Sequence, residues 1–99
     1  MIERVTELAE LPFEYFLGRA CRKFRRGTLD LSASRMIEQS GQHISRSRIS
    51  DFENGHTHST KFLQLYVLAD TTKQNELSTI LQQATDDYIS YLAKLSMPH

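Results

Sequence analysis

The sequence has little of what anchors, exports or cross-links a protein. Cys21 is its only cysteine, so no disulfide can form within the chain. No apolar run reaches the roughly 18 residues that a membrane-spanning helix needs. The first residues, MIERVTELAE, carry acids where a secretory signal carries bases, so we expect a cytoplasmic protein. With 99 residues, of which 39% are hydrophobic, the chain suits one domain with a single core.

Residues that carry catalysis or hold metal ions are also scarce. There is no glycine-rich phosphate loop and no Ser, His and Asp pattern typical of a nucleophile. Asp86 and Asp87 are adjacent, so on a helix they would point in different directions and could not act as a carboxylate pair. Three histidines and the cysteine do not have zinc-finger spacing. These four residues are Cys21, His43, His56 and His58. We therefore expect no enzyme, no metal site and no cofactor, and we expect Cys21 to be a buried structural thiol.

The net charge is zero, which at first argues against a nucleic-acid partner. The charges are, however, unevenly distributed. Residues 19–61 have a net charge of +5, whereas residues 1–18 and 62–99 have net charges of −3 and −2. A basic middle segment between acidic ends favours a partner that is an anion and that binds to the middle of the chain.

Helical spacing of apolar residues recurs along the chain, and period-2 alternation does not persist. The pattern predicts an all-α fold of five or six helices without a linker or a repeat. The expected helices are 13–26, 32–40, 45–54, 60–70 and 74–96. Residues 1–11 could form a short amphipathic lead-in. The last helix would be about 34 Å long.

Local signals predict where these helices begin and end. Pro12 suits the first turn of the first helix and Gly27 its end. Ser32 or Ser34 can cap the second helix, and Gly41 can end it. The caps predicted for the following helices are Ser45 and Thr60, and Gly55 is the predicted stop after residue 54.

Residues 45–55, SRSRISDFENG, combine a polar edge that we expect to be exposed with an apolar edge that we expect to be buried. Ile49 and Phe52 lie three residues apart on the side expected to face inward. The outward residues are Arg46, Ser47, Arg48, Ser50 and Asp51. Together with the preceding short helix and a polar turn, this pattern indicates a helix-turn-helix whose second helix lies in the major groove.

The segments ISRSRISDFENG and HTHSTKFLQLYVLAD resemble the phage-repressor/Cro-like helix-turn-helix family. The resemblance covers about residues 17–70, with the motif at 32–55 and the recognition helix at about 45–54. It implies a repressor-like domain over residues 1–99 in which a long helix at 72–99 follows the motif. Gln42 and His43 lengthen the turn of the motif by about two residues relative to the family.

The resemblance also implies roles for individual residues. Arg46, Ser47, Ser50 and Asp51 match positions that reach base edges or nearby phosphates, and Arg48 lies between them. Glu53 matches an acid that pairs with an arginine of the first helix, which here would be Arg25 or Arg26. A further set matches positions that touch phosphate or lies beside such positions. This set is Ser32, Arg35, His43, Ser45, His56, His58, Ser59 and Lys61.

The apolar side chains of the last helix, 74–96, continue further along the helix than the core of a repressor-like domain should need. The surplus side chains Tyr88, Tyr91, Leu92 and Leu95 are therefore the predicted homodimer interface, with residues 1–11 as the alternative. We expect a dimeric, nucleoid-associated repressor that binds a pseudo-palindromic double-stranded DNA operator. Three alternatives remain open: an antitoxin that also binds a toxin, a protein-interaction module on the same fold, and an RNA-binding protein.

Overall fold

The computed structural model describes residues 10–57 and 59–96, and within these ranges it confirms the predicted all-α fold, with no strand. The predicted amphipathic lead-in at residues 1–11 lies mostly outside the described residues. Three short helical turns of other types connect the α-helices: a π-helical turn, η1 (Phe24–Leu29), and two 3₁₀ turns, η2 (Thr60–Phe62) and η3 (Thr71–Lys73). The five α-helices are α1 (Phe13–Lys23), α2 (Ala33–Ser40), α3 (Arg46–Glu53), α4 (Leu63–Ala69) and α5 (Gln74–Ser96).

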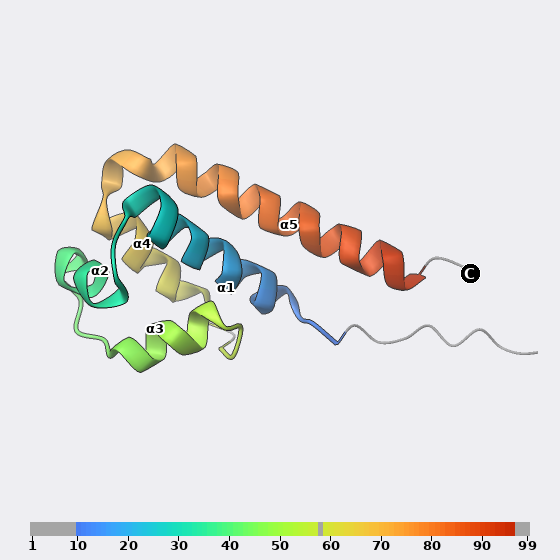
Figure 1. Ribbon diagram of the computed structural model, residues 1–99, viewed down its shortest axis with the longest axis horizontal. Helices are drawn as coiled ribbons and strands as arrows, with labels where there is room; N and C mark the ends of the chain where they lie inside the picture. Colours follow the sequence, from blue (N-terminus) through green and yellow to red (C-terminus); the bar gives the residue numbers. More distant parts are fainter. Residues whose placement is uncertain (1–9, 58, 97–99) are drawn as a thin grey trace, which may run out of the picture.

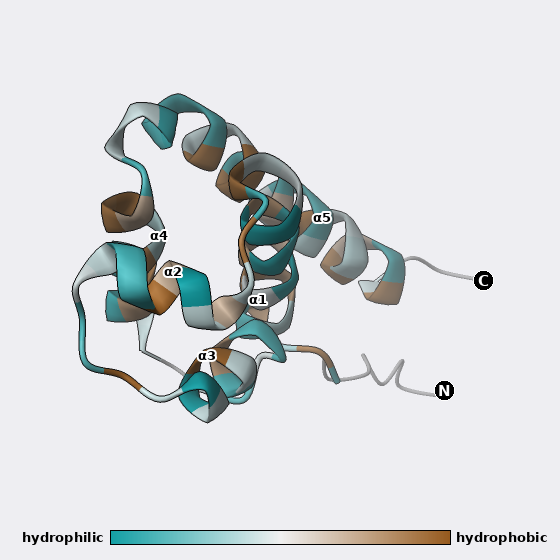
Figure 2. Cartoon of the chain, turned by 60° about the vertical axis from the view of Figure 1, so that its left-hand side comes forward, coloured by the Kyte–Doolittle hydropathy of each residue, from teal (hydrophilic) through white to brown (hydrophobic). Residues whose placement is uncertain are grey.

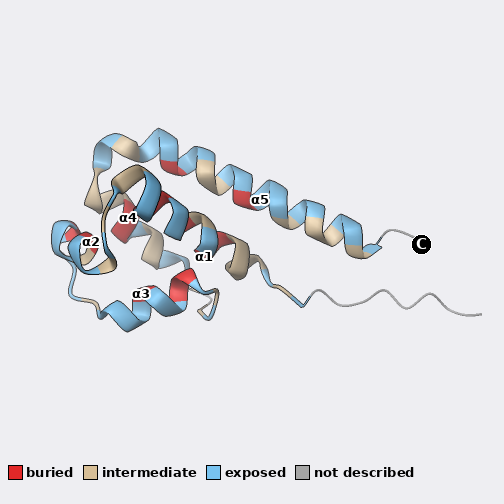
Figure 3. Cartoon of the chain, viewed as in Figure 1, coloured by how far each residue is buried: buried red, intermediate tan, exposed pale blue. Residues whose placement is uncertain are grey.

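Helix α1 lies at the centre of the fold, with α5 along one side and the end of α3 against another (Figure 1). Helices α2 and α4 pack against each other at the far end of α1. The apolar stripes and the buried residues lie on the helix sides that face this interior (Figures 2 and 3). The buried core residues come from all five α-helices and from η1. They are Leu17, Cys21, Phe24, Met36, Ile49, Phe52, Leu65, Tyr66 and Leu77.

Several predicted helix ends are confirmed. The Ser32 hydroxyl accepts a hydrogen bond from the Arg35 N–H at 3.2 Å, as an N-cap residue does. Gly41 and Gly55 have φ angles of 73° and 79°, the left-handed conformation that glycine adopts without a steric penalty. Helix α5 spans Gln74–Ser96, the predicted range.

Other predicted boundaries are wrong. Gly27 does not end the first helix, because the chain continues through η1 until Asp30, whose φ of 55° marks the turn. This wider turn carries Phe24 and Arg25 into the interior, where both are buried. Pro12 precedes the helix instead of lying in its first turn.

The predicted caps Ser45 and Thr60 also differ from the structure. Ser45 occupies the N-cap position of α3, but its hydroxyl lies 3.1 Å from the Ser47 hydroxyl and makes no cap hydrogen bond to the backbone. Thr60 lies inside η2, and Ser59 takes the N-cap position before it.

Gly18 marks the place where α1 crosses the end of α3. A Cβ atom at this position would lie 2.4 Å from the carbonyl oxygen of Phe52 and 2.6 Å from that of Glu53. Backbone oxygens in a packed helix cannot move aside as the end of a flexible side chain can. The two helices can therefore come this close only because residue 18 has no side chain.

We expect Gly18→Ala to lower the free energy of unfolding by about 1–3 kcal/mol, because overpacking forces the backbone to shift. Gly27→Ala is the matched control, since a Cβ atom there would meet nothing within 4 Å. The control should gain about 0.4–1 kcal/mol through reduced freedom of the unfolded chain. Urea unfolding of both variants checks this, and a neutral Gly18→Ala would contradict the close crossing.

Candidate nucleic-acid interface

Helix α3 presents one exposed polar edge and one buried edge. The five residues predicted to read bases, Arg46, Ser47, Arg48, Ser50 and Asp51, are all exposed. On the opposite edge, Ile49 is 0% exposed and Phe52 is 2% exposed. The predicted division of α3 into an exposed polar edge and a buried apolar edge is therefore confirmed. The exposed edge lies on the side of α3 that faces away from α1 and α5 (Figures 1 and 3).

Aromatic contacts hold the buried edge of α3. The Phe52 ring is stacked on Phe62 with centroids 5.3 Å apart, and its centroid lies 5.9 Å from that of Tyr66. Contacts of this kind contribute about 0.5–1.5 kcal/mol beyond the burial of apolar area. They connect α3 to η2 and α4, so the helix has packed neighbours beyond its own short hydrogen-bonded turns.

A buried ion pair fixes the C-terminal end of α3 to the first helix. The Arg25 guanidinium donates two hydrogen bonds to Glu53, from Nε to Oε2 and from Nη2 to Oε1, each 2.8 Å long. It donates a third, from Nη1, to the carbonyl oxygen of Leu31 at 2.9 Å. Arg25 is 8% exposed and Glu53 5%. Of the two predicted partners of Glu53, the structure selects Arg25, and Arg26 is exposed.

Tyr66 completes this network, and the sequence reasoning missed it. Its hydroxyl donates a hydrogen bond of 2.7 Å to Glu53 Oε2. Burial first, and then the Glu53 charge, raise the pKa of Tyr66, while the hydrogen bonds to Glu53 raise the pKa of Arg25. The signal for this contact was a tyrosine on the apolar face of a helix, because a buried tyrosine hydroxyl usually needs a partner.

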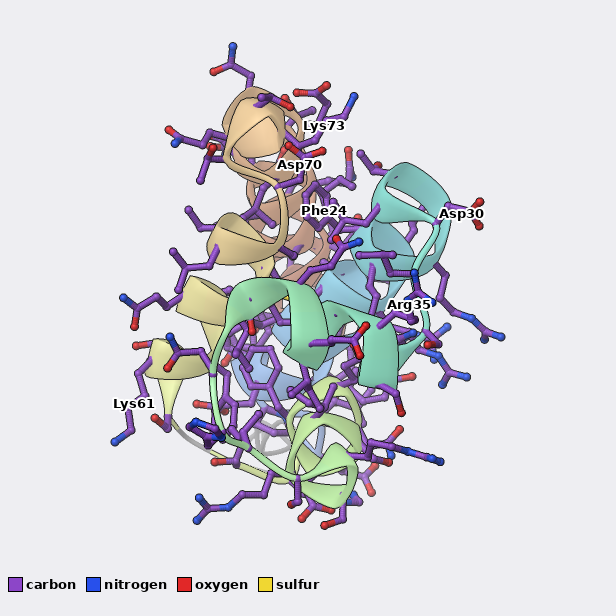
Figure 4. The ribbon with its side chains drawn as sticks, turned by 90° about the vertical axis from the view of Figure 1, so that its left-hand side faces the viewer. Phe24, Asp30, Arg35, Lys61, Asp70 and Lys73 are labelled. Carbon is purple, nitrogen blue, oxygen red and sulfur yellow. The ribbon has the colours of Figure 1, made fainter. Side chains whose placement is uncertain are left out.

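The residues predicted to touch phosphate are spread around α2, α3 and the following loop. Six of them are exposed: Ser32, Arg35, His43, Ser45, His56 and Lys61. Ser59 is half-buried, and His58 lies outside the described residues. In Figure 4, Lys61 and Arg35 lie on opposite sides of the molecule. The set therefore forms a broad rim, with no single point at which it converges.

The basic segment of the first helix lies beside this rim. Arg22, Lys23 and Arg26 are exposed. A groove of about 370 Å³ is lined by Arg22 from α1, Ala33 from α2, and Arg46, Ser47 and Ser50 from α3. Arg22 and the exposed edge of α3 thus border one groove, a relation that sequence spacing alone did not reveal.

The predicted dimer residues are only partly free of the monomer core. The Tyr88 ring centroid lies 5.4 Å from that of Phe13 and 5.5 Å from that of Phe16. The Tyr91 hydroxyl accepts hydrogen bonds from the N–H groups of residues 10 and 11, at 3.0 and 3.1 Å. The expectation that both tyrosines are surplus to the monomer is wrong, because the start of α1 packs against this part of α5. Leu92 and Leu95 are half-buried.

The cysteine and the histidines form no cluster in the structure. Within residues 10–57 and 59–96, no three His, Cys, Asp or Glu side chains lie close enough to hold a metal ion. Cys21 is fully buried, as predicted, and burial together with the Glu53 charge raises the pKa of its thiol to about 12. None of the described helices is both long and apolar enough to cross a membrane.

Comparisons of the chain with models of protein families, with curated proteins and with solved structures find no match.

Proposed function

We propose that this protein is a sequence-specific double-stranded DNA-binding transcriptional regulator of the helix-turn-helix type. One observation carries the proposal: α3 exposes Arg46, Ser47, Arg48, Ser50 and Asp51 along one edge, while a buried network holds its other edge in place. A helix that reads base edges needs both properties, because its side chains must reach the groove from a rigid support.

In this proposal, α3 enters the major groove with its N-terminal turn foremost. Arginine can donate two hydrogen bonds to guanine O6 and N7, so Arg46 and Arg48 are the main base readers. Ser47, Ser50 and Asp51 supply shorter donors and acceptors for neighbouring bases. The exposed residues around α2 and the loop after α3 bind phosphate and set the orientation of the helix.

Selection of bound duplexes from a random pool, followed by footprinting, tests the proposal. We expect an enriched site made of two related half-sites, about 10 base pairs apart from centre to centre. Recovery of no enriched sequence by a folded protein would contradict sequence-specific binding and would favour the protein-interaction alternative.

We further propose that the regulator is a homodimer joined through the C-terminal part of α5. The final turns of α5 extend past the start of α1 (Figure 1). Ile89, just before these turns, is 57% exposed, and it is the one large apolar side chain exposed among the described residues. It lies one turn before the predicted interface residue Leu92, so a second copy could cover both side chains.

Ile89→Asp should therefore produce monomers by light scattering at concentrations where the unaltered protein is dimeric. The unfolding temperature of the monomer should change little, because Ile89 is exposed. Lys94→Asp is the control, because it also introduces an aspartate on α5 but removes no apolar side chain. A dimer that persists in Ile89→Asp would move the interface away from this part of α5.

A further inference from the structure

Arg22 near the end of α1 borders the exposed edge of α3, and Arg26 of η1 borders the neighbouring groove. Arg22 lines the groove of about 370 Å³ together with Arg46, Ser47 and Ser50. Arg22 and Arg26 also line a second groove, of about 430 Å³, beside Ser32 and Ala33 at the start of α2. The two grooves share the lining residues Arg22, Arg25 and Ala33, so they adjoin each other, and together they are called the hollow.

This hollow has an excess of positive charge. Arg22 and Arg26 are exposed, and no ion pair joins either side chain to a carboxylate in the part of the chain that the structure describes. Glu53, which lines the first groove, is already bound by Arg25. The one other acid along the hollow is Asp30. An anionic ligand would therefore meet guanidinium groups that need not first leave another partner.

We propose that Arg22 and Arg26 bind the phosphate backbone of DNA that flanks the bases read by α3. This inference rests on the proposed function. Guanidinium groups bind phosphate with paired hydrogen bonds, and each neutralised phosphate releases condensed counterions. The first groove is bordered by Arg46, Ser47 and Ser50, which are proposed to read bases, and this shared border favours a DNA strand over an acidic segment of another protein.

The same stretch of chain carries a second pair of exposed cations, Arg19 and Lys23. They line a larger hollow, of about 740 Å³, between α1 and α5, which Arg22 and Arg26 border as well. Neither Arg19 nor Lys23 lines the two grooves beside α2 and α3. Replacing Arg19 and Lys23 removes the same net charge from the same part of the chain, but it leaves the proposed phosphate path intact.

The experiment compares the unaltered protein with Arg22→Gln/Arg26→Gln and with Arg19→Gln/Lys23→Gln. Binding to a mixed-sequence duplex of about two helical turns is measured from about 50 to 200 mM salt. Losing two phosphate contacts should make the slope of log K against log salt less steep by about 1.8 in the first variant. Its affinity should then fall about tenfold less than that of the unaltered protein over this range. The control should keep the original slope, and circular dichroism should show that both variants are folded.

Equal slopes for the unaltered protein and Arg22→Gln/Arg26→Gln would overturn the inference. Slopes that become less steep by the same amount in both variants would also overturn it, because the loss of net charge alone would then explain the change. Loss of affinity at a constant slope would also contradict phosphate contact, because a lost phosphate contact must change the slope. If the unaltered protein binds no duplex at any salt concentration, the proposed function itself fails, whereas the other outcomes leave it standing.

Discussion

Arg46→Ala and Arg48→Ala are each expected to weaken binding to the selected DNA site by about 5- to 150-fold. This range corresponds to about 1–3 kcal/mol for a bidentate contact between arginine and guanine. Both side chains are exposed, and neither forms an ion pair with another described residue. Thermal stability should therefore change by no more than about 0.5 kcal/mol.

The measurement that separates base reading from simple attraction is the ratio of affinities for the selected site and for a site changed at one base pair. A base-reading arginine lowers this ratio, whereas a phosphate-binding arginine weakens both affinities alike. Lys94→Ala is the control, because it removes an exposed cation from the last turn of α5. Unchanged discrimination in either arginine variant would remove that residue from the set of base readers.

The second large effect is expected at the buried network that holds α3. Glu53→Gln keeps the shape of the side chain but removes the charge that faces Arg25. Removing one partner of a buried ion pair costs about 3–5 kcal/mol, because the other charge stays buried without compensation. For a domain of this size, that corresponds to a fall of more than about 10 °C in the unfolding temperature.

Two companion variants show whether the buried charge causes this effect. Tyr66→Phe removes only the hydroxyl that donates to Glu53 Oε2, so its cost should be smaller, about 1–3 kcal/mol. Arg35→Gln breaks the pair between Arg35 and Glu38, whose side chains are 67% and 74% exposed, and it should cost less than about 1 kcal/mol. The losses are measured by calorimetry or thermal circular dichroism. If Arg35→Gln lowers the free energy of unfolding as much as Glu53→Gln does, burial of the ion pair does not cause the effect.

Several local features were predicted correctly because they depend on neighbouring residues, although the caps at Ser45 and Thr60 were not. The cap at Ser32, the left-handed glycines at 41 and 55, and the limits of α5 all follow from signals within a few positions of each helix end. The inward position of Ile49 and Phe52 follows from their spacing along one turn. The failed predictions at Gly27 and Tyr88 share a different cause. In both cases a contact with a distant segment decided the local outcome.

Gly27 shows this dependence most clearly. A glycine after a basic helix is a reasonable stop signal, yet the helix passes it because Phe24 and Arg25 are buried against other elements. Arg25 reaches Glu53, which is 28 residues away in the chain. No window of sequence around residue 27 contains that interaction, so no local rule could predict the wider turn of η1.

By itself, the sequence determined the helical class, the polar edge of α3 and the pattern of charge along the chain. These properties depend on composition and on the 3.6-residue period, which are local. Only the tertiary structure decided which arginine pairs with Glu53, that Tyr66 joins this pair, and that Arg22 borders the same groove as Arg46. It also decided that Tyr88 and Tyr91 pack against the first helix. These contacts join residues far apart in the chain, and they form only when the helices pack around one core.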